Sequence, residues 1–382
     1  MLTPKRTAIL AAVVLTFIYF LHTNDSALPS PSATSINGAA RTAGNLKSET
    51  ETAAPRATSP ADATTQRPYP PKLTGANKKT SQRPLVEVAS KNVREQLAYQ
   101  FEYDMQGKFP AYIWQTWKYM PSQGDFGDTF RPAEASWTEQ HPGFVHEVVT
   151  DRNALSLIKL LYASVPEIIE AYEALPMAVM KADLFRYLIL LARGGIYSDI
   201  DTTALKSALD WLPQDIPRSS VGLVVGIEAD PDREDWMNWF SRRIQFCQWT
   251  IQAKPGHPVL RDIVAKVVED TLGMKKRGTL KEHNMEKSVI EFTGPAAWTD
   301  AIFDYMNNPK HFNMKDGNNI SWQDFTGMEN AKKVGDVVVL PITSFSPGVQ
   351  QMGAKEPDDP MAFVHHEFEG SDRENVHDDH QS

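Results

Sequence analysis

The segment Lys181–Asp201 constrains the fold of this chain more than any other part, because it joins an apolar helix, a glycine break and a short strand followed by carboxylates. From Ala178 to Ala192 no proline interrupts a run rich in Leu, Ala and Met. Gly194 and Gly195 then supply residues that end helices with a positive φ. The pattern predicts a helix that stops at the glycines and a strand that starts directly after them.

Two charged residues interrupt the apolar surface of this predicted helix. Asp183 and Arg186 are three positions apart, so both side chains lie on one face. Buried charges are costly unless they are paired, so one interpretation is an internal ion pair. The other interpretation places the pair at the border of a polar cleft, where each side chain binds a sugar hydroxyl or a phosphate.

Two aspartates follow the glycines. Ile196–Asp199 has the composition of a strand, and the two-residue period of a strand would place Asp199 and Asp201 on the same side of the chain. Such a carboxylate pair suits a hard divalent cation, Mn²⁺ or Mg²⁺, completed by diphosphate oxygens and water. The second D-x-D sequence, Asp230–Asp232, contains a proline and lies among charged residues, which indicates a charged turn.

The rest of the folded part alternates strand and helix signals. This alternation predicts one large α/β domain with a mostly parallel central sheet. Ser164 and Glu167 have the spacing of a capping box. The predicted strands cover residues 111–116, 144–149, 196–199, 221–228 and 337–340, and the other predicted helices cover 132–140 and begin at 151 and near 165.

The N-terminal part differs in composition from the rest. Lys5 and Arg6 precede an apolar run that predicts a signal anchor with the bulk of the chain in the lumen, and a cleaved signal peptide is the alternative. The net charge of −9 disfavours nucleic-acid binding. The predicted organisation is a cytoplasmic tail (1–7), a transmembrane anchor (8–23), a disordered stem (24–94), a catalytic domain (95–370) and an acidic tail (371–382).

Several isolated residues have a structural and a functional interpretation each. One of His365 and His366 fits a cation ligand supplied by a loop, although surface histidines are more common. Trp114 and Trp117 would stack a base or fill the core. Thr293 fits a helix cap as well as a substrate contact. The single cysteine, Cys247, indicates a buried structural residue.

Taken together, these motifs resemble glycosyltransferase family 32, and most of all its fungal members that initiate the α-1,6-mannose outer chain of N-glycans. The resemblance covers about Pro110 to Gly370. Its specific segments are 113–117, 165–172, 181–201, 226–230, 292–295, 346–348 and 352–366.

The resemblance implies a GT-A fold, GDP-mannose as donor, Mn²⁺ as cofactor with Mg²⁺ as the other candidate, and a single-pass type II enzyme in the Golgi membrane. It assigns the metal to Asp199, Asp201 and His366, and the grip on donor sugar and diphosphate to Asp183 and Arg186. The other implied donor-binding residues are Ile113, Trp114, Gln115, Tyr197 and Ser198. One departure is Asp372 after Ser371, where the family has an aromatic residue, which affects closure of the C-terminal loop.

The implied function is retaining transfer of mannose from GDP-mannose to a core mannose of an N-glycan acceptor. Two alternatives stand beside it. One is mannosyl transfer to inositol-phosphoceramide, and the other is a non-catalytic subunit of a Golgi mannosyltransferase (mannan-polymerase) complex. A metal-dependent phosphohydrolase is a third alternative of a different class.

Overall fold

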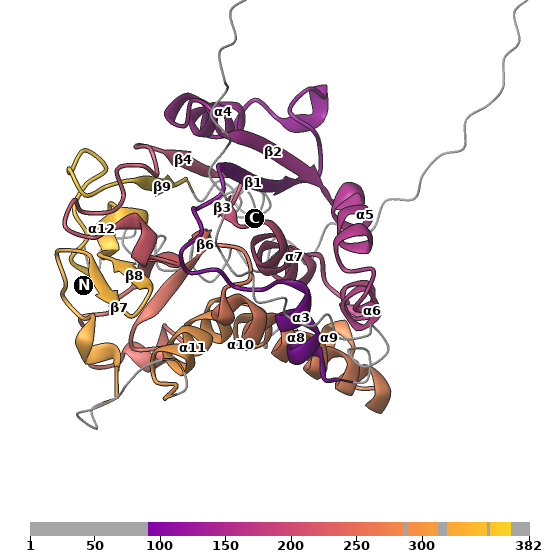
Figure 1. The fold of residues 1–382 in the computed structure, drawn as a ribbon. Coiled ribbons are helices and arrows are strands. Elements are labelled where there is room, and N and C mark those ends of the chain that lie inside the picture. The colour runs from indigo at the N-terminus through magenta and orange to yellow at the C-terminus, as the bar shows by residue number, and fades with distance from the viewer. Residues whose placement is uncertain (1–90, 286–288, 310, 312–318, 350–351, 368–382) are drawn as a thin grey trace, which may run out of the picture. The chain divides into compact units, whose positions relative to one another are not determined.

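The computed structural model describes residues 91–285, 289–309, 311, 319–349 and 352–367 (Figure 1). All of these residues belong to one compact unit. The predicted tail, anchor, most of the stem, the acidic tail and Asp372 lie outside the described residues. Within the described ranges, no helix is both long and apolar enough to cross a bilayer.

The centre of the domain is a seven-stranded sheet in the order β2-β1-β3-β6-β5-β8-β7. Strands β2, β1, β3, β5 and β8 run in one direction, whereas β6 and β7 run in the other. The predicted α/β fold with a mostly parallel sheet is therefore confirmed. The strands are β1 (Tyr112–Trp117), β2 (Val145–Thr150), β3 (Gly195–Ser198), β5 (Leu223–Ala229), β6 (Gln245–Ala253), β7 (Lys332–Val334) and β8 (Val337–Leu340).

Strand β6 is the longest of the strands that the sequence pattern did not predict. Its polar residues fall on no consistent period, because Gln245 and Gln248 are three positions apart and Thr250 and Gln252 are two. All nine residues of the strand are nevertheless buried, since β6 lies between β3 and β5 in the middle of the sheet. The strands on both sides cover the edges of β6, so its residues are buried although several of its side chains are polar.

Helices cover one face of the sheet, and a smaller layer covers the other (Figure 1). The smaller layer contains α4 and a two-stranded sheet of β4 (Thr202–Ala204) and β9 (Val364–His366). The helices are α3 (Val93–Gln100), α4 (Arg131–Gln140), α5 (Asp151–Leu161), α6 (Pro166–Ala174), α7 (Ala178–Arg193), α8 (Pro258–Arg277), α9 (Glu282–Met285), α10 (Val289–Phe292), α11 (Pro295–Met306) and α12 (Ile342–Phe345).

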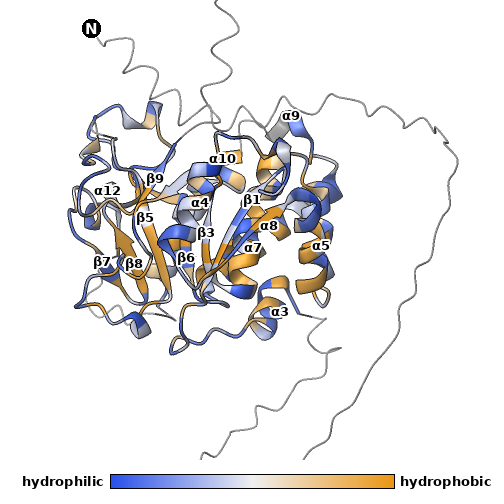
Figure 2. Cartoon of the chain, turned by 90° about the horizontal axis from the view of Figure 1, so that it is seen from above, coloured by the Kyte–Doolittle hydropathy of each residue, from blue (hydrophilic) through white to orange (hydrophobic). Residues whose placement is uncertain are grey.

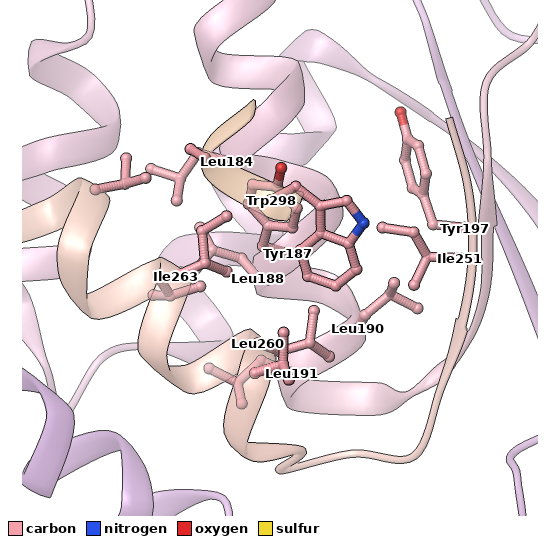
Figure 3. Close-up of a cluster of buried hydrophobic side chains, with 14 of the residues drawn as sticks. Leu184, Tyr187, Leu188, Leu190, Leu191, Tyr197, Ile251, Leu260, Ile263 and Trp298 are labelled. Atoms are coloured by element: carbon pink, nitrogen blue, oxygen red, sulfur yellow. The ribbon is translucent and has the colours of Figure 1, made fainter. Parts of the chain in front are cut away.

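The larger core lies between the sheet and helices α7, α8 and α11. Figure 3 shows leucines of α7 packed against Leu260 and Ile263 of α8, with Trp298 of α11 beside them. Along β5, Leu223 and Val225 face this core whereas Val224 faces the smaller layer, as the two-residue period requires. Figure 2 shows the buried strands β5 and β8 in the hydrophobic colour. A strand covered on both faces needs apolar residues at nearly every position.

The predicted capping box before α6 is wrong. Pro166 occupies the first turn, which makes Val165 the N-cap, and no side chain caps this helix. A proline at that position is pre-organised for a helix start and lacks the amide hydrogen that a cap would satisfy. The Ser164 hydroxyl instead donates a hydrogen bond to Gln100 Oε1 at 2.7 Å, which ties α3 to this loop.

The glycine break between α7 and β3 contains two consecutive residues with positive φ. Gly194 and Gly195 have φ values of 64° and 97°. A Cβ on Gly195 would lie 2.5 Å from the carbonyl oxygen of Tyr112 in the neighbouring strand β1. The helix therefore ends where predicted, and the glycine also allows β3 to pair closely with β1.

Gly195→Ala is therefore expected to destabilise the domain by about 3 kcal/mol, because it adds an overlap with backbone to a strained φ. Chemical denaturation measures the loss, and Gly143→Ala is the matched control. Gly143 also has a positive φ of 90°, but nothing lies within 4 Å of its added Cβ. A Gly195→Ala loss no larger than that of Gly143→Ala would refute the close-approach argument.

Candidate active site

The site lies where β3 ends. Residues Asp199 and Asp201 form a turn between β3 and β4, and the amide of Thr202 closes it by donating to the Asp199 carbonyl oxygen at 3.2 Å. The prediction that the strand period aligns the two aspartates is therefore wrong in its reason, since β3 ends at Ser198. The turn, not the strand, sets the directions of these carboxylates.

Arg186 is the centre of the polar cluster beside this turn. Its Nη2 lies 3.1 Å from Asp183 Oδ1 and 3.4 Å from Asp199 Oδ1. Its Nη1 donates to the carbonyl oxygen of Gln248 at 3.0 Å, and its guanidinium lies 5.0 Å from the centre of the Tyr197 ring. The Asp183–Arg186 pair is therefore an internal ion pair, as the first interpretation predicted, and Arg186 also reaches the turn of the aspartates. The second interpretation, a polar cleft that binds a sugar or a phosphate, stays a prediction.

Burial and charge oppose each other in this cluster. Burial raises the pKa of Asp183 to about 6, although Arg186 and a hydroxyl donor act against the rise. Burial also opposes the charge on Arg186, but Asp199, Tyr197 and Asp183 together raise its pKa above the ordinary value. Arg186 therefore stays charged, and its charge opposes the rise in the pKa of both neighbouring carboxylates.

Thr293 holds the second oxygen of Asp183. Its hydroxyl donates to Asp183 Oδ2 at 2.7 Å, so it is neither a helix cap nor an exposed contact, and Gly294 is the N-cap of α11. The Gln248 amide in turn donates to the Tyr187 hydroxyl at 2.8 Å and to the Thr293 carbonyl oxygen at 3.0 Å. These contacts fix the rotamer of Asp183, and none of them has a signal in the local sequence.

The pairing of β4 with β9 brings together two of the three predicted metal ligands, Asp201 and His366. Thr202 pairs with His366, which places His366 Nε2 3.6 Å from Asp201 Oδ1. His366 thus comes from a strand, not from the expected loop, while His365 lies at the surface and contacts Glu367. Burial lowers the pKa of His366 to about 4, so its ring is neutral at pH 7, the form that binds metals.

The two aspartates have the oxygen ligands that a hard divalent cation prefers. The negative charge of Asp201 raises the pKa of Asp199, in addition to the larger effect of burial, so the two carboxylates are close enough to repel each other. A cation between them would remove that repulsion. Among the described residues no group of three or more His, Cys, Asp or Glu side chains is placed so that it could hold a metal ion, so the cation site at this turn stays a prediction.

The residues predicted to bind the donor from β1 and β3 have buried side chains. Ile113 is fully buried in the core, and Trp114 donates its Nε1 hydrogen bond to the Gly194 carbonyl oxygen at 3.0 Å. Gln115 donates to the Asp199 carbonyl oxygen at 3.0 Å, and the Ser198 hydroxyl bonds to other hydroxyls. The side chains of Gln115 and Ser198 support the turn, whereas those of Ile113 and Trp114 belong to the core. A donor contact by these residues stays a prediction for their main-chain atoms.

Trp117 and Tyr197 are two further aromatic residues for which the sequence suggested a ligand contact. Trp117 packs against Phe130 and donates to the Phe126 carbonyl oxygen at 3.2 Å, which places it in a small core cluster and away from a base-stacking role. The Tyr197 hydroxyl donates to Asp199 Oδ1 at 2.9 Å. Tyr197 therefore shares this oxygen with Arg186 and orients the carboxylate.

The second D-x-D sequence is not the simple charged turn that was predicted. Asp230 is buried, and it accepts hydrogen bonds from Arg243 Nη1 at 2.8 Å, the Thr326 hydroxyl at 2.9 Å and the Gly327 amide at 2.6 Å. Only Asp232 is exposed. The two aspartates have the same spacing as Asp199 and Asp201. Here, however, the carboxylate of the first aspartate already accepts hydrogen bonds from groups of the protein itself.

Glu228 is a buried carboxyl that the sequence pattern did not single out. It lies near the end of β5, and among the described residues its Oε2 has no hydrogen-bond partner, nor has Gln245 Oε1. Burial raises the pKa of Glu228 to about 8, although a hydrogen bond from Gln245 and the charge of Arg186 oppose the rise. Glu228 is therefore mostly protonated at neutral pH, and Cys247 beside it is buried as predicted.

The raised pKa of Glu228 predicts a pH dependence of stability. Its stabilising contribution is complete below the ordinary pKa of 4.5 and is lost as the pH rises through 8. In that window the free energy of unfolding falls by up to about 1.4 kcal/mol per pH unit. Glu228→Gln removes the titration, so its advantage over the wild type in urea denaturation should grow between pH 5 and pH 8. A constant difference would contradict the assignment.

The cluster as a whole is suited to hold an anionic, hydroxyl-bearing ligand. Among the described residues, the buried Nε of Arg186 has no hydrogen-bond partner, so one donor of a charged guanidinium remains for a ligand oxygen. The side chains of Asp199 and Asp201 are 27% and 13% exposed, which makes the turn accessible at its outer side. A phosphate oxygen and a sugar hydroxyl are the groups that match these donors and acceptors.

Comparison with known proteins agrees with this geometry. The family model described as "Glycosyltransferase sugar-binding region containing DXD motif" matches residues 127–216, a range that contains Asp183, Arg186, Asp199 and Asp201. The initiation-specific α-1,6-mannosyltransferase of Candida albicans is 48% identical over 292 residues, which cover 73% of this chain and 76% of that protein.

Two further relatives come from Schizosaccharomyces pombe. Its initiation-specific α-1,6-mannosyltransferase is 44% identical over 278 residues, 72% of this chain and 66% of that protein. Its inositol phosphoceramide mannosyltransferase 3 is 32% identical over 92 residues, which are 24% of each chain. The similarity to the first of these proteins thus spans about three times as much of this chain as the similarity to the second.

Proposed function

Because this chain belongs to glycosyltransferase family 32, the family whose DXD-containing sugar-binding region it carries, we propose that it transfers mannose in α-1,6 linkage from GDP-mannose to an N-glycan. The proposed cofactor is Mn²⁺, with Mg²⁺ as the alternative. The proposed location is the Golgi membrane, with the catalytic domain in the lumen and the N-terminal segment as anchor.

One observation supports this proposal above the others: Arg186 joins the sugar-gripping Asp183 to the turn of Asp199 and Asp201. A nucleotide-sugar donor presents hydroxyls at one end and a diphosphate next to them. In the same order, the cluster offers the hydrogen-bond acceptors of Asp183 and the fixed positive charge of Arg186. A phosphohydrolase would need only the groups that bind the diphosphate. It would not need a buried carboxylate that binds the sugar.

The residues of the chain have distinct roles in the proposed transfer. Asp183, held by Thr293, accepts a hydrogen bond from a hydroxyl of the donor mannose and fixes its orientation. Arg186 binds a diphosphate oxygen and stabilises the charge that develops when the bond from the anomeric carbon to the diphosphate breaks. Asp199, Asp201 and His366 would hold the divalent cation, which supplies further neutralisation of the leaving diphosphate.

The proposed reaction needs no nucleophile from the protein, because every bond that forms or breaks belongs to the donor or the acceptor. The acceptor hydroxyl oxygen forms a bond to the anomeric carbon, the bonding electrons leave with the diphosphate, and the hydroxyl proton passes to a diphosphate oxygen. GDP-mannose carries α-linked mannose, so an α-1,6 product retains the configuration. Front-face attack of this kind requires a water-excluding site more than an added catalytic base.

Two other functions remain to be separated by experiment. Transfer to inositol-phosphoceramide would use the same donor machinery, but the relative with that name matches only 92 residues. A non-catalytic subunit of a mannosyltransferase complex would keep the fold without turnover.

A donor-by-acceptor screen of the purified full-length chain tests the proposal. The donors are GDP-mannose, GDP-fucose and UDP-glucose, the acceptors are a high-mannose N-glycan and inositol-phosphoceramide, and each reaction runs with Mn²⁺, Mg²⁺ or EDTA. We expect transfer only from GDP-mannose to the N-glycan, loss with EDTA, and an α-1,6 linkage by NMR. Transfer to the lipid alone, or hydrolysis that no acceptor accelerates, would refute it.

A further inference from the structure

The main-chain carbonyl of Asp199 is held by a side chain that is itself held by a second one. Gln115 on β1 donates from its Nε2 to the Asp199 carbonyl oxygen at 3.0 Å. The Oε1 of the same amide lies 2.8 Å from Nε2 of His146 on β2, the strand that pairs with β1. His146, which the sequence pattern did not single out, therefore reaches the turn of Asp199 and Asp201 through one intermediate side chain.

The chemistry of the amide fixes the direction of these hydrogen bonds. An amide oxygen can only accept, so His146 must carry a proton on Nε2 and donate it to Gln115. The other ring nitrogen, Nδ1, lies 2.9 Å from the hydroxyl of Thr138 on α4, and in the neutral ring it accepts a hydrogen bond from that hydroxyl. A rotation of the Gln115 amide would turn its nitrogen toward the donor Nε2 of His146, so the histidine favours the orientation in which Gln115 donates to the turn.

His146 is shielded from water and stays neutral. Its side chain is 6% exposed, and burial lowers the pKa of the ring to about 4. Glu134 Oε1 lies 3.8 Å from Nδ1, which is too far for a hydrogen bond. Because the ring is uncharged and both of its nitrogens are bonded, it has one preferred orientation, and its bond to Gln115 fixes the amide in turn.

Helix α4 supports the same turn by a second route. Trp137, the residue before Thr138, donates from Nε1 to the Thr202 carbonyl oxygen at 2.9 Å. The Thr202 hydroxyl donates to the Asp199 carbonyl oxygen at 2.5 Å, so the two routes end on the same atom. Figure 1 shows α4 beside β2 and β4, the strands that carry its partners. The turn should therefore stay folded when only the route through His146 is cut.

The position of this carbonyl oxygen matters because Asp199 carries its carboxylate on the same residue. Asp199 Oδ1 accepts a hydrogen bond from the Tyr197 hydroxyl at 2.9 Å and lies 3.4 Å from Arg186 Nη2. A rotation of the Asp199 backbone would change both distances. A misplacement of about 1 Å at a reacting centre can lower a rate about a hundred-fold, so the hold on this backbone bears on the chemistry.

We propose that His146 is a positioning residue of the active site: it holds Gln115 and, through it, the turn of Asp199 and Asp201 in the conformation that sugar transfer requires. This inference rests on the proposed function for the reaction, whereas the hold on the turn exists with or without a donor. A purely structural role would depend on the shape of the imidazole ring. The proposed role depends on one hydrogen-bond donor at the position of Nε2.

Two substitutions separate these roles, because they differ in reach and not in charge. His146→Gln places an amide nitrogen as many bonds from Cα as Nε2 of histidine, whereas the shorter side chain of His146→Asn extends only as far as Nδ1. Only the glutamine can therefore restore the hydrogen bond to Gln115. His283→Asn, at an exposed histidine of α9, is the matched control.

Hydrogen exchange and kinetics of the full-length chain give two independent measurements. Exchange over residues 199–204, followed by mass spectrometry without donor, should be faster in His146→Asn and close to wild type in His146→Gln. With GDP-mannose and a high-mannose N-glycan, kcat should fall about ten-fold in His146→Asn and stay within about two-fold in His146→Gln. The KM for the N-glycan should not change in either variant. His283→Asn should leave both measurements unchanged.

The outcomes separate this inference from the proposed function. Faster exchange in His146→Asn alone, in a chain whose wild type transfers no mannose, would support the role of His146 at the turn and refute the function. Wild-type exchange and kcat in His146→Asn would overturn the inference. Equal losses in His146→Gln and His146→Asn would also overturn it, because the ring and not its donor would then matter. In a Gln115→Leu background His146→Asn should cost no further activity, and an additional loss there would contradict the route through Gln115.

Discussion

Asp201→Ala is expected to lower the rate of mannosyl transfer at least about a hundred-fold, because it removes one of the carboxylates that neutralise charge at the leaving diphosphate. Asp201 lies in a turn with its side chain 13% exposed, beside His366. The turn itself is closed by backbone atoms of Asp199 and Thr202, so the domain should remain folded. Rates at saturating GDP-mannose and Mn²⁺ measure the loss.

The control for this prediction is Asp215→Ala, which removes an exposed carboxylate elsewhere in the domain. Its rate should equal that of the wild type. Thermal melts of both variants should lie within a few degrees of the wild-type Tm. Transfer by Asp201→Ala within a few-fold of the wild type would show that the turn does not serve the leaving group.

Arg186→Ala is expected to cost about 3 to 5 kcal/mol of stability and to abolish measurable transfer. The change leaves the buried Asp183 and the neighbouring Asp199 without their shared cation, and a buried charge that loses its partner is strongly destabilising. It also removes the stacking of the guanidinium on Tyr197. Urea denaturation at pH 7 measures the loss of stability.

A second substitution tests the reason for that loss. Asp183→Asn in the Arg186→Ala background removes the carboxylate charge while keeping a side chain of the same size. The double variant should therefore recover part of the lost stability without recovering activity, a coupling that a double-mutant cycle measures. Additive losses would mean that the arginine stabilises the domain by packing and not by its charge.

Local patterns were sufficient for the elements that lead into the site. The end of α7 at the glycines and the start of β3 directly after them were predicted correctly, because helix propensity and positive φ are properties of neighbouring residues. The ion pair of Asp183 and Arg186 follows from their spacing of three on one helix. Each of these predictions depends on atoms that are close along the chain.

Predictions failed where a distant segment decides the outcome. Ser164 bonds to Gln100 and not to its own helix, and Asp230 is buried by donors from residues about 13 and 96 positions away. Strand β6 lacks a clear period because it is covered on both faces and both edges. In each case tertiary contacts outweigh a local preference of at most about 1 kcal/mol.

By itself, the sequence determined the helix, the glycine break, the strand and the two aspartates that follow, together with the α/β class. Only the tertiary structure decided that Thr293 holds Asp183, that His366 lies beside Asp201, and that Glu228 is a protonated carboxyl. The physical reason is that burial and charge compensation depend on which segments the sheet brings together. The pairing of β4 with β9 joins residues at least 160 positions apart, and no local period encodes such a contact.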